Sequence, residues 1–220
     1  MKNLDYLTNY KTYIGKPIEI FPKIRSDGRK ILSFAGFMQE RINLEKSLAN
    51  KDKFWHNKSY VTGDAIAYTP NLEAKILLDY EPNLKSRFID GAEIISREQY
   101  ETFDGIELTR DEVNSYGSVI PLRKEEVLKS PIFIDLSREH GLLRKFVNVV
   151  KPVYDEYGEQ NTLHVQIESM LTKQDILDGK YFIRPLLIIN RGNSCIVFGL
   201  NTYDLNSRMV GIPKDTHLQK

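Results

Sequence analysis

The first quarter of the chain combines an alternating pattern with a helical one. Residues 18–21 alternate between apolar and polar, residues 26–29 have the composition of a turn, and residues 31–34 return as a second apolar run. From residue 37 to 49, apolar residues recur near helical spacing between charges. The pattern predicts a β-hairpin within residues 18–37 and a helix packed on it.

Two further hydrophobic patterns follow. Residues 60–80 read as two strands around the turn Thr69-Pro70-Asn71. The compact apolar run at residues 131–136 predicts a buried strand, after which Ser137 is expected to cap a helix that continues to Val150. A strand followed by a helix is a common unit of mixed folds.

Helix start signals lie between these patterns. Residues 96–99 and 109–112 both fit the capping box, in which a hydroxyl and a side chain three residues later satisfy free backbone donors. They predict short helices at residues 97–103 and 110–115.

The last third of the chain has mainly strand character. Residues 162–171 fit both a strand and a helix face, and the strand is favoured. Runs at residues 181–190, 195–200 and 208–212, separated by polar turns, predict an antiparallel meander. The expected class is α+β, with mainly antiparallel sheet, several short helices and a C-terminal β-meander.

Length and composition indicate a folded globular protein. The chain has 220 residues, of which 41% are hydrophobic and 28% are charged. We expect one domain over residues 1–220, with a subdivision near 116–130 and a β-rich part over 160–212. The single cysteine, Cys195, excludes an internal disulfide and is expected to lie in a strand.

Charge narrows the choice of partners. Lysine and arginine total 31 against 30 acidic residues, so the chain as a whole has no field that attracts nucleic acid or an anionic membrane. No run of apolar residues is long enough for a membrane span or a recognisable signal peptide. The expectation is a cytoplasmic or otherwise intracellular protein without a membrane partner.

One short stretch, from Gly63 to Lys75, places acids and a lysine at a spacing that a known chemistry uses. Hard oxygen ligands bind a divalent metal that activates water, and a nearby lysine stabilises charge on a phosphate. Asp64 and Glu73 could be the ligands, with Lys75 as the cation. The other interpretation is that Glu73 and Lys75 are charges on the wet face of a half-buried strand.

This stretch resembles the PD-(D/E)xK nuclease superfamily, whose members place an aspartate, then an acid, any residue and a lysine, on a hairpin. The resemblance implies that Asp64 and Glu73 bind Mg²⁺ or Mn²⁺ and that Lys75 orients or activates the attacking water. It also implies an upstream glutamate, for which Glu40 and Glu45 are both candidates.

Other candidate sites have simpler interpretations. The four histidines, His56, His140, His164 and His217, form no pair at metal-ligand spacing. Some polar or aromatic groups could serve binding, but each is also typical of ordinary surface or core. They are the row His164, Gln166 and Glu168, the basic helix face of Arg138, Arg144, Lys145 and Lys151, and the aromatic residues Phe54, Trp55 and Tyr60.

Two functions therefore compete. The first is a non-enzymatic binding or assembly protein, for example a component of a viral-type assembly, which acts through protein partners or self-association and needs no cofactor. The second is a metal-dependent nuclease that uses Asp64, Glu73 and Lys75 on DNA or RNA. A shared cleft for these three residues would favour the nuclease, because two ligands of one metal must lie close together.

Overall fold

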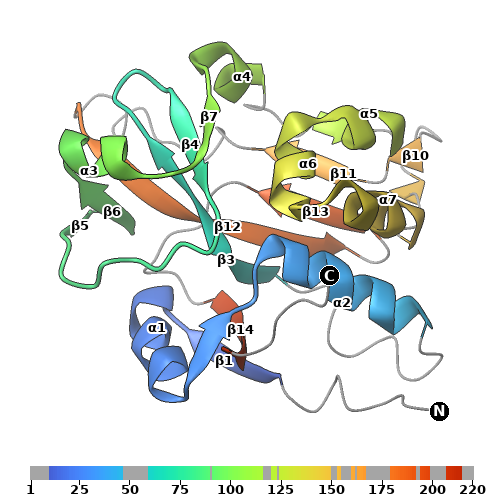
Figure 1. Cartoon of the computed structure of the whole chain (residues 1–220), viewed down its shortest axis with the longest axis horizontal. Helices are drawn as coiled ribbons and strands as arrows, with labels where there is room; N and C mark the ends of the chain where they lie inside the picture. The colour runs from blue at the N-terminus through green and yellow to red at the C-terminus, as the bar shows by residue number, and fades with distance from the viewer. Residues whose placement is uncertain are drawn as a thin grey trace.

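A computed structural model gives the architecture of the chain (Figure 1). The structure describes residues 10–46, 59–89, 91–115, 120–122, 124–149, 153–154, 160–161, 163–166, 179–191, 194–198 and 207–214.

Helices and strands alternate along the chain. The strands are β1 (Lys11–Gly15), β2 (Arg29–Ile31), β3 (Ser59–Tyr68), β4 (Ala74–Leu77), β5 (Phe88–Ile89), β6 (Ala92–Ile95), β7 (Ile106–Leu108), β8 (Ile120–Leu122), β9 (Val153–Tyr154), β10 (Gln160–Asn161), β11 (Leu163–Gln166), β12 (Tyr181–Arg191), β13 (Ser194–Phe198) and β14 (Ser207–Pro213). The helices are α1 (Pro17–Ser26), α2 (Phe34–Lys46), α3 (Arg97–Thr102), α4 (Arg110–Ser115), α5 (Lys124–Lys129), α6 (Pro131–Ser137) and α7 (His140–Val149). The predicted α+β class is confirmed.

A mixed sheet runs through the molecule in the order β1-β14-β3-β12-β13-β11-β8. Most neighbours are antiparallel, whereas β14 with β3 and β11 with β13 are parallel pairs. Beside this path, β2 pairs with β14, β4 joins β3 to β7, and β6 joins β12 to β5. The first and last described strands, β1 and β14, are therefore hydrogen-bonded to each other.

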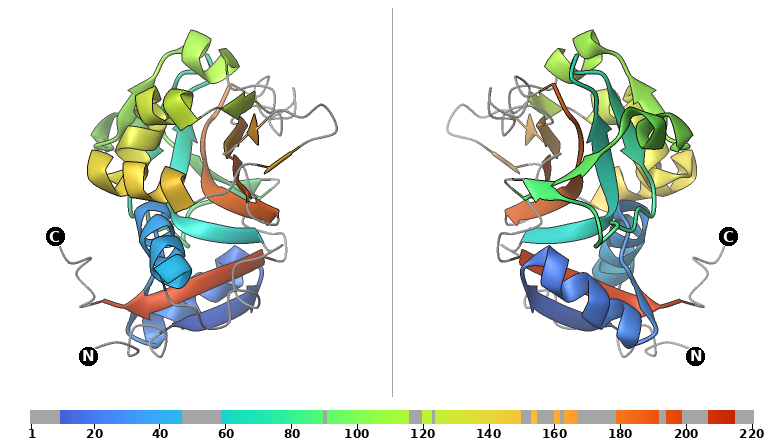
Figure 2. Two further views of the ribbon diagram at one scale, coloured as in Figure 1. Left: turned by 90° about the vertical axis from the view of Figure 1, so that its right-hand side faces the viewer. Right: turned by 90° about the vertical axis from the view of Figure 1, so that its left-hand side faces the viewer.

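Helices cover both faces of the sheet (Figure 2). On one face, α2, α6 and α7 pack together through Phe34, Phe37, Phe133 and Phe146, whose ring centroids lie 6.3–6.5 Å apart. On the other face, Tyr100 of α3 packs against apolar residues of β3, β4 and β12. In the part of the chain that the structure describes, we find no helix long and apolar enough to cross a bilayer.

The predicted hairpin over residues 18–37 is wrong, because residues 17–26 form helix α1. Pro17 occupies the first helical position, where its missing N–H has no partner to lose. Ile20, Phe21 and Ile24 are buried on one side of this helix. Alternation over only four residues could not distinguish a strand from a helix, and packing on Val61 and Met209 decided for the helix. The helix predicted after it is confirmed as α2.

The predicted strand at residues 131–136 is also wrong, because these residues form helix α6. Pro131 begins the helix, and Ile132, Phe133 and Leu136 face the core from one side. Ser137 does not cap the following helix. Its hydroxyl donates to the carbonyl of Ile134 at 2.7 Å, which closes α6 instead.

The C-terminal strands are confirmed as elements, but they do not form a three-stranded meander. β12 and β13 make the expected antiparallel pair. β14 leaves that pair and inserts between β1 and β3 on the sheet path. The hairpin β3–β4 and both capping-box helices, α3 and α4, are present as predicted, and residues 163–166 form the favoured strand.

Candidate functional site

The site predicted from sequence begins at an irregularity in β3. The pairing of β3 with β12 shifts register between Pro185 and Leu187. Proline has no N–H to donate, so a regular ladder cannot continue through it. At the shift, the hydroxyl of Thr62 donates to the carbonyl of Leu186 at 3.0 Å and replaces a backbone bond. This bulge changes the direction of the residues that follow it.

Gly63 allows another segment to approach the bulge closely. Its N–H donates to the carbonyl of Leu32 at 3.0 Å, in the link between β2 and α2. A Cβ at this position would lie 3.1 Å from the carbonyl oxygen of Ile31. The absence of a side chain at Gly63 thus lets the start of α2 lie against β3, directly beside Asp64.

The Asp64 carboxylate is buried, with only 1% of the residue exposed. Its Oδ2 accepts a hydrogen bond from the N–H of Phe34, the first residue of α2, at 2.6 Å. Its Oδ1 accepts from the N–H of Asp79 at 3.0 Å and lies 3.3 Å from Nη2 of Arg138. One carboxylate thereby fastens β3 to the start of α2, to the turn after β4 and to the end of α6.

Arg138 completes a cluster that we call the carboxylate joint, made of Asp64, Asp79 and Arg138. The Arg138 guanidinium also contacts Oδ2 of Asp79 at 2.7 Å. Arg138 and Asp79 both have left-handed backbones, with φ of 60° and 51°. Non-glycine residues rarely adopt this conformation, so the contacts with Asp64 hold two strained turns in place.

Electrostatics in the joint are set by burial. Loss of hydration raises the pKa of the Asp64 carboxyl, against the two backbone hydrogen bonds and the Arg138 charge, which lower it. Burial would lower the pKa of Arg138, but its hydrogen bond to Asp79 and the charges of both aspartates raise it. Arg138 therefore stays charged and compensates the buried acid.

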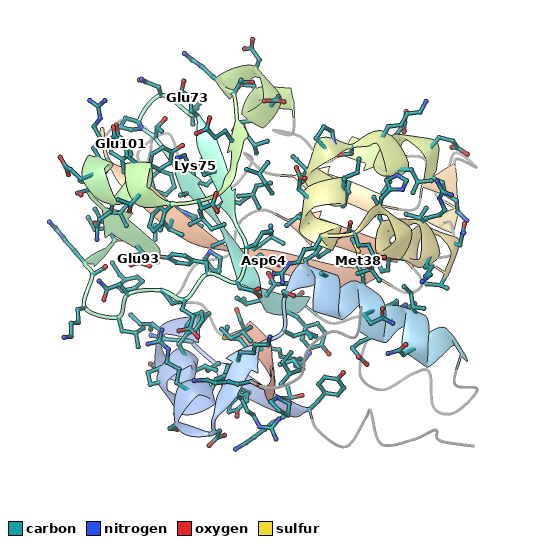
Figure 3. The ribbon with its side chains drawn as sticks, viewed as in Figure 1. Met38, Asp64, Glu73, Lys75, Glu93 and Glu101 are labelled. Carbon is teal, nitrogen blue, oxygen red and sulfur yellow. The ribbon has the colours of Figure 1, made fainter. Side chains whose placement is uncertain are left out.

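Lys75 lies on the opposite face of the β3–β4 hairpin from Asp64 (Figure 3). Lys75 pairs with Ala67, whose side chain belongs to the cluster under α3, whereas Asp64 points toward α2 and α6. The Lys75 ammonium lies 4.9 Å from the ring centroid of Tyr100 and 3.5 Å from a carboxylate oxygen of Glu107. These contacts are a cation–π interaction and an ion pair.

Glu73 lies in the turn before β4 and is exposed. Its backbone, not its carboxylate, makes the structural contacts there, since its N–H donates to the hydroxyl of Thr69 at 3.1 Å. Asp64, Glu73 and Lys75 therefore do not share one cleft, contrary to what the nuclease interpretation requires. The sequence spacing was correct for a hairpin. Lys75 pairs with Ala67, which lies three positions from Asp64 in β3. Because side chains alternate between the two faces along a strand, Asp64 and Lys75 face opposite sides.

The two upstream glutamate candidates differ in what the structure describes. Glu40 is buried in α2, and burial raises its pKa against hydrogen bonds from Tyr10 and Asn43. It therefore has neighbours of its own and does not reach Asp64 in any described contact. Glu45 lies in the last turn of the same helix.

The other predicted groups are dispersed. His140 is exposed at the start of α7, His164 lies in β11 and Cys195 lies in β13, as expected for that cysteine. Arg144 and Lys145 are exposed on α7, whereas Arg138 lies before the helix. Tyr60 is core. The described residues contain no group of three or more potential metal ligands. Phe54, Trp55, His56, Lys151, Glu168 and His217 lie outside the described residues.

Glu93 of β6 is a further buried carboxylate, which sequence reasoning missed. Its carboxylate accepts from the hydroxyl of Tyr80 at 2.8 Å and from the N–H of Asn83 at 3.1 Å. Burial raises its pKa, against these bonds and one from Ser86. Glu93 thus holds the segment between β4 and β5 against the sheet. Its signal in the sequence was an acid inside the otherwise apolar strand Ala92–Ile95.

Comparison with known proteins identifies the architecture. No protein-family model and no curated protein matches the chain. A solved structure is similar over 92% of this chain and 97% of its own, with a TM-score of 0.65 and 14% sequence identity. This chain has the C-type lectin fold. The similar structure shows how the C-type lectin fold accommodates massive sequence variation in Nanoarchaeota.

Proposed function

We propose that this C-type-lectin-fold chain is a non-enzymatic binding or assembly protein that acts through protein–protein contacts. The fold is compatible with a binding role, and the similar structure concerns a protein in which this fold accommodates massive sequence variation. A framework that keeps its shape while its side chains change is suited to recognition, because recognition surfaces vary with the partner.

The observation that carries the proposal is the carboxylate joint. Asp64 is the acid with the strongest claim to chemistry in the sequence, and its oxygens are occupied by Phe34, Asp79 and Arg138. The buried carboxylate Glu93 has the same kind of role toward the segment after β4. Both fasten connecting segments to the sheet, which is how a scaffold gives its loops a defined shape for binding.

The nuclease alternative stays a prediction of the sequence alone. A metal bound by Asp64 would have to displace two backbone donors and an arginine, and Lys75 would act from the other side of the hairpin. A component of a viral-type assembly fits the binding proposal as one particular case of it.

A direct test combines chemistry with association. Wild type, Lys75→Ala and the exposed control Lys145→Ala are incubated with fluorescent single- and double-stranded DNA and RNA and with Mg²⁺ or Mn²⁺. The same preparations are analysed by sedimentation velocity and chemical cross-linking with mass spectrometry, alone and with candidate partner proteins. We expect no cleavage by any variant and reproducible protein–protein cross-links. Metal-dependent cleavage that Lys75→Ala loses and Lys145→Ala retains would refute the proposal.

A further inference from the structure

The balanced total charge of the chain hides a local excess of positive charge. Residues 11–30, which form β1, α1 and β2, contain six basic and two acidic residues, and we call this region the basic end. Lys11, Lys16, Lys23 and Arg25 are exposed there, and Arg29 and Lys30 are half-buried. Lys11 is paired with Asp27, and Arg25 is paired with Glu81 from the segment after β4.

A second region has the opposite excess. Residues 97–112, which form α3, β7 and the start of α4, contain six acidic and two basic residues, and we call this region the acidic end. All six acids are exposed: Glu98, Glu101, Asp104, Glu107, Asp111 and Glu112. One of the two basic residues, Arg97, is already paired with Glu101. Phe103 and Ile106 lie half-buried between these acids.

The two ends lie on opposite sides of the molecule. In Figure 1, α1 and β1 lie at the bottom, α4 lies at the top with β7 below it, and α3 lies at the side above the level of α1. Helices α5, α6 and α7 carry mixed charges, with Lys124, Lys129, Arg144 and Lys145 interspersed among Glu125, Glu126 and Asp135. The surface charge is therefore polarised along one direction.

The basic end also has an apolar anchor. Ile14 of β1 is 72% exposed. Among the residues that the structure describes, two large hydrophobic side chains are exposed, and Ile14 is the more exposed of them. It lies between Lys11 and Lys16 in the sequence, on an edge of the sheet path. A contact with a second copy would bury this aliphatic side chain, while the neighbouring lysines would select an acidic partner surface.

We propose that the chain self-associates head to tail, with the basic end of one copy docked on the acidic end of the next and Ile14 buried at the contact. This inference rests on the proposed binding function and names its partner as a second copy of the chain. The observations that carry it are the opposite charges, their positions at opposite ends, and the exposed Ile14 within one of them. A second copy offers an acidic surface to the basic end and a basic surface to the acidic end.

The geometry has a consequence for the size of the assembly. A head-to-tail contact uses two different surfaces, so each copy keeps one end free after a first contact. Such contacts close into a ring or continue into a filament, and they do not stop at a two-fold dimer. The self-association is therefore expected to give species larger than a dimer as the concentration rises.

Salt provides the first measurement. Exposed charges are screened over about 8 Å at physiological ionic strength and over about 30 Å at 0.01 M. Sedimentation velocity of the wild type at micromolar to millimolar concentrations should show association at low salt that weakens about tenfold or more at 0.5 M salt. A wild type that stays monomeric throughout, or an association that salt does not weaken, would overturn the inference.

Charge exchange provides the decisive measurement. Lys16→Glu with Lys23→Glu cancels the positive excess of the basic end, and Asp104→Lys with Asp111→Lys cancels the negative excess of the acidic end. Each double variant should lose association about tenfold or more by itself, and an equimolar mixture of the two should recover association as 1:1 pairs, because only one intact contact joins them. Recovery is expected because each variant then offers the end that the other lacks.

A matched control separates local from total charge. Arg144→Glu with Lys145→Glu changes the net charge as much as the basic-end variant but lies on α7. This control should retain association, and Ile14→Thr should weaken it without altering the salt dependence. Equal loss in the control, or no recovery in the mixture, would overturn the inference.

The result is distinguishable from a failure of the proposed function. A chain that binds another protein but not itself contradicts only the head-to-tail contact, whereas metal-dependent cleavage contradicts the binding function. A fluorescent single-stranded DNA added in the same experiment covers the other ligand that a basic end could take. Binding of DNA through Lys16 and Lys23 without self-association would also overturn the inference.

Discussion

Replacing Asp64 should destabilise the protein strongly. The Asp64→Ala substitution removes the acceptor for two backbone N–H groups and leaves the Arg138 charge without its buried partner. Hydrogen bonds to charged groups contribute about 1.5–3 kcal/mol each, and the lost ion pair adds less, because Arg138 is partly exposed and keeps its contact with Asp79. These contributions overlap, so we expect a loss of about 3–5 kcal/mol in the free energy of unfolding.

The Asp64→Asn variant should lose less, about 2–3 kcal/mol, because the amide keeps one acceptor oxygen. The raised pKa of Asp64 shows that burial of the charge is only partly compensated, and the neutral amide avoids that cost. An Arg138→Met substitution should be less damaging in the Asn variant than in wild type, since the two changes affect one ion pair.

Urea denaturation followed by circular dichroism measures these losses, with Asp111→Ala as the control. Asp111 is an exposed aspartate on α4 and should change stability by no more than about 0.5 kcal/mol. For a chain of this length, the Asp64→Ala loss corresponds to a fall in Tm of about 10 °C. An Asp64→Ala protein as stable as wild type would refute the assignment of Asp64 to the framework.

Three further outcomes are expected. Burial raises the pKa of Glu93 above its usual 4.5, so its contribution to stability is fully present below pH 4.5 and is lost as pH rises through the folded-state pKa. The free energy of unfolding, measured with urea between pH 4.5 and 7, should therefore fall with pH in wild type but not in Glu93→Gln. Parallel pH profiles of the two proteins would contradict this. Gly63→Ala should lower the free energy of unfolding by about 1–3 kcal/mol, because its Cβ would lie 3.1 Å from the Ile31 carbonyl oxygen. An unchanged Tm in thermal unfolding would contradict this close approach. Lys75→Met should lower the free energy of unfolding by less than about 1 kcal/mol. The methionine side chain still packs on Tyr100, and the lost ion pair with Glu107 is partly exposed. A loss above about 2 kcal/mol would show that the Lys75 charge contributes more.

Some elements could be predicted because their signals are local. The capping box at Ser96 satisfies N–H groups within three residues, and the structure contains both reciprocal hydrogen bonds. The turn between β3 and β4 and the long strand β12 likewise follow from nearby residues. The errors at residues 18–21 and 131–136 concerned short apolar runs, which fit a strand and a helix equally well until a neighbouring surface selects one.

The candidate site could be predicted only in part. The spacing from Gly63 to Lys75 singled out Asp64, and its role in a metal site stays a prediction, whereas the structure places its carboxylate among framework contacts. Which face Asp64 occupies depends on the pairing of β3 with β4, and its hydrogen-bond donors come from positions 30 residues before and 15 and 74 residues after it. Glu93 was missed for the same reason, because its importance lies in the segment that it holds.

The sequence by itself determined the α+β class, most of the strands and the capped helices, since hydrophobic period and capping are properties of neighbouring residues. Only the tertiary structure decided that β14 inserts beside β1 and β3, that the Asp64 carboxylate joins β3 to α2 and α6, and that the segments 11–30 and 97–112 lie far apart. These features depend on segments far apart in the chain, and the free energy that fixes them comes from packing and from the satisfaction of buried polar groups, which no local pattern contains.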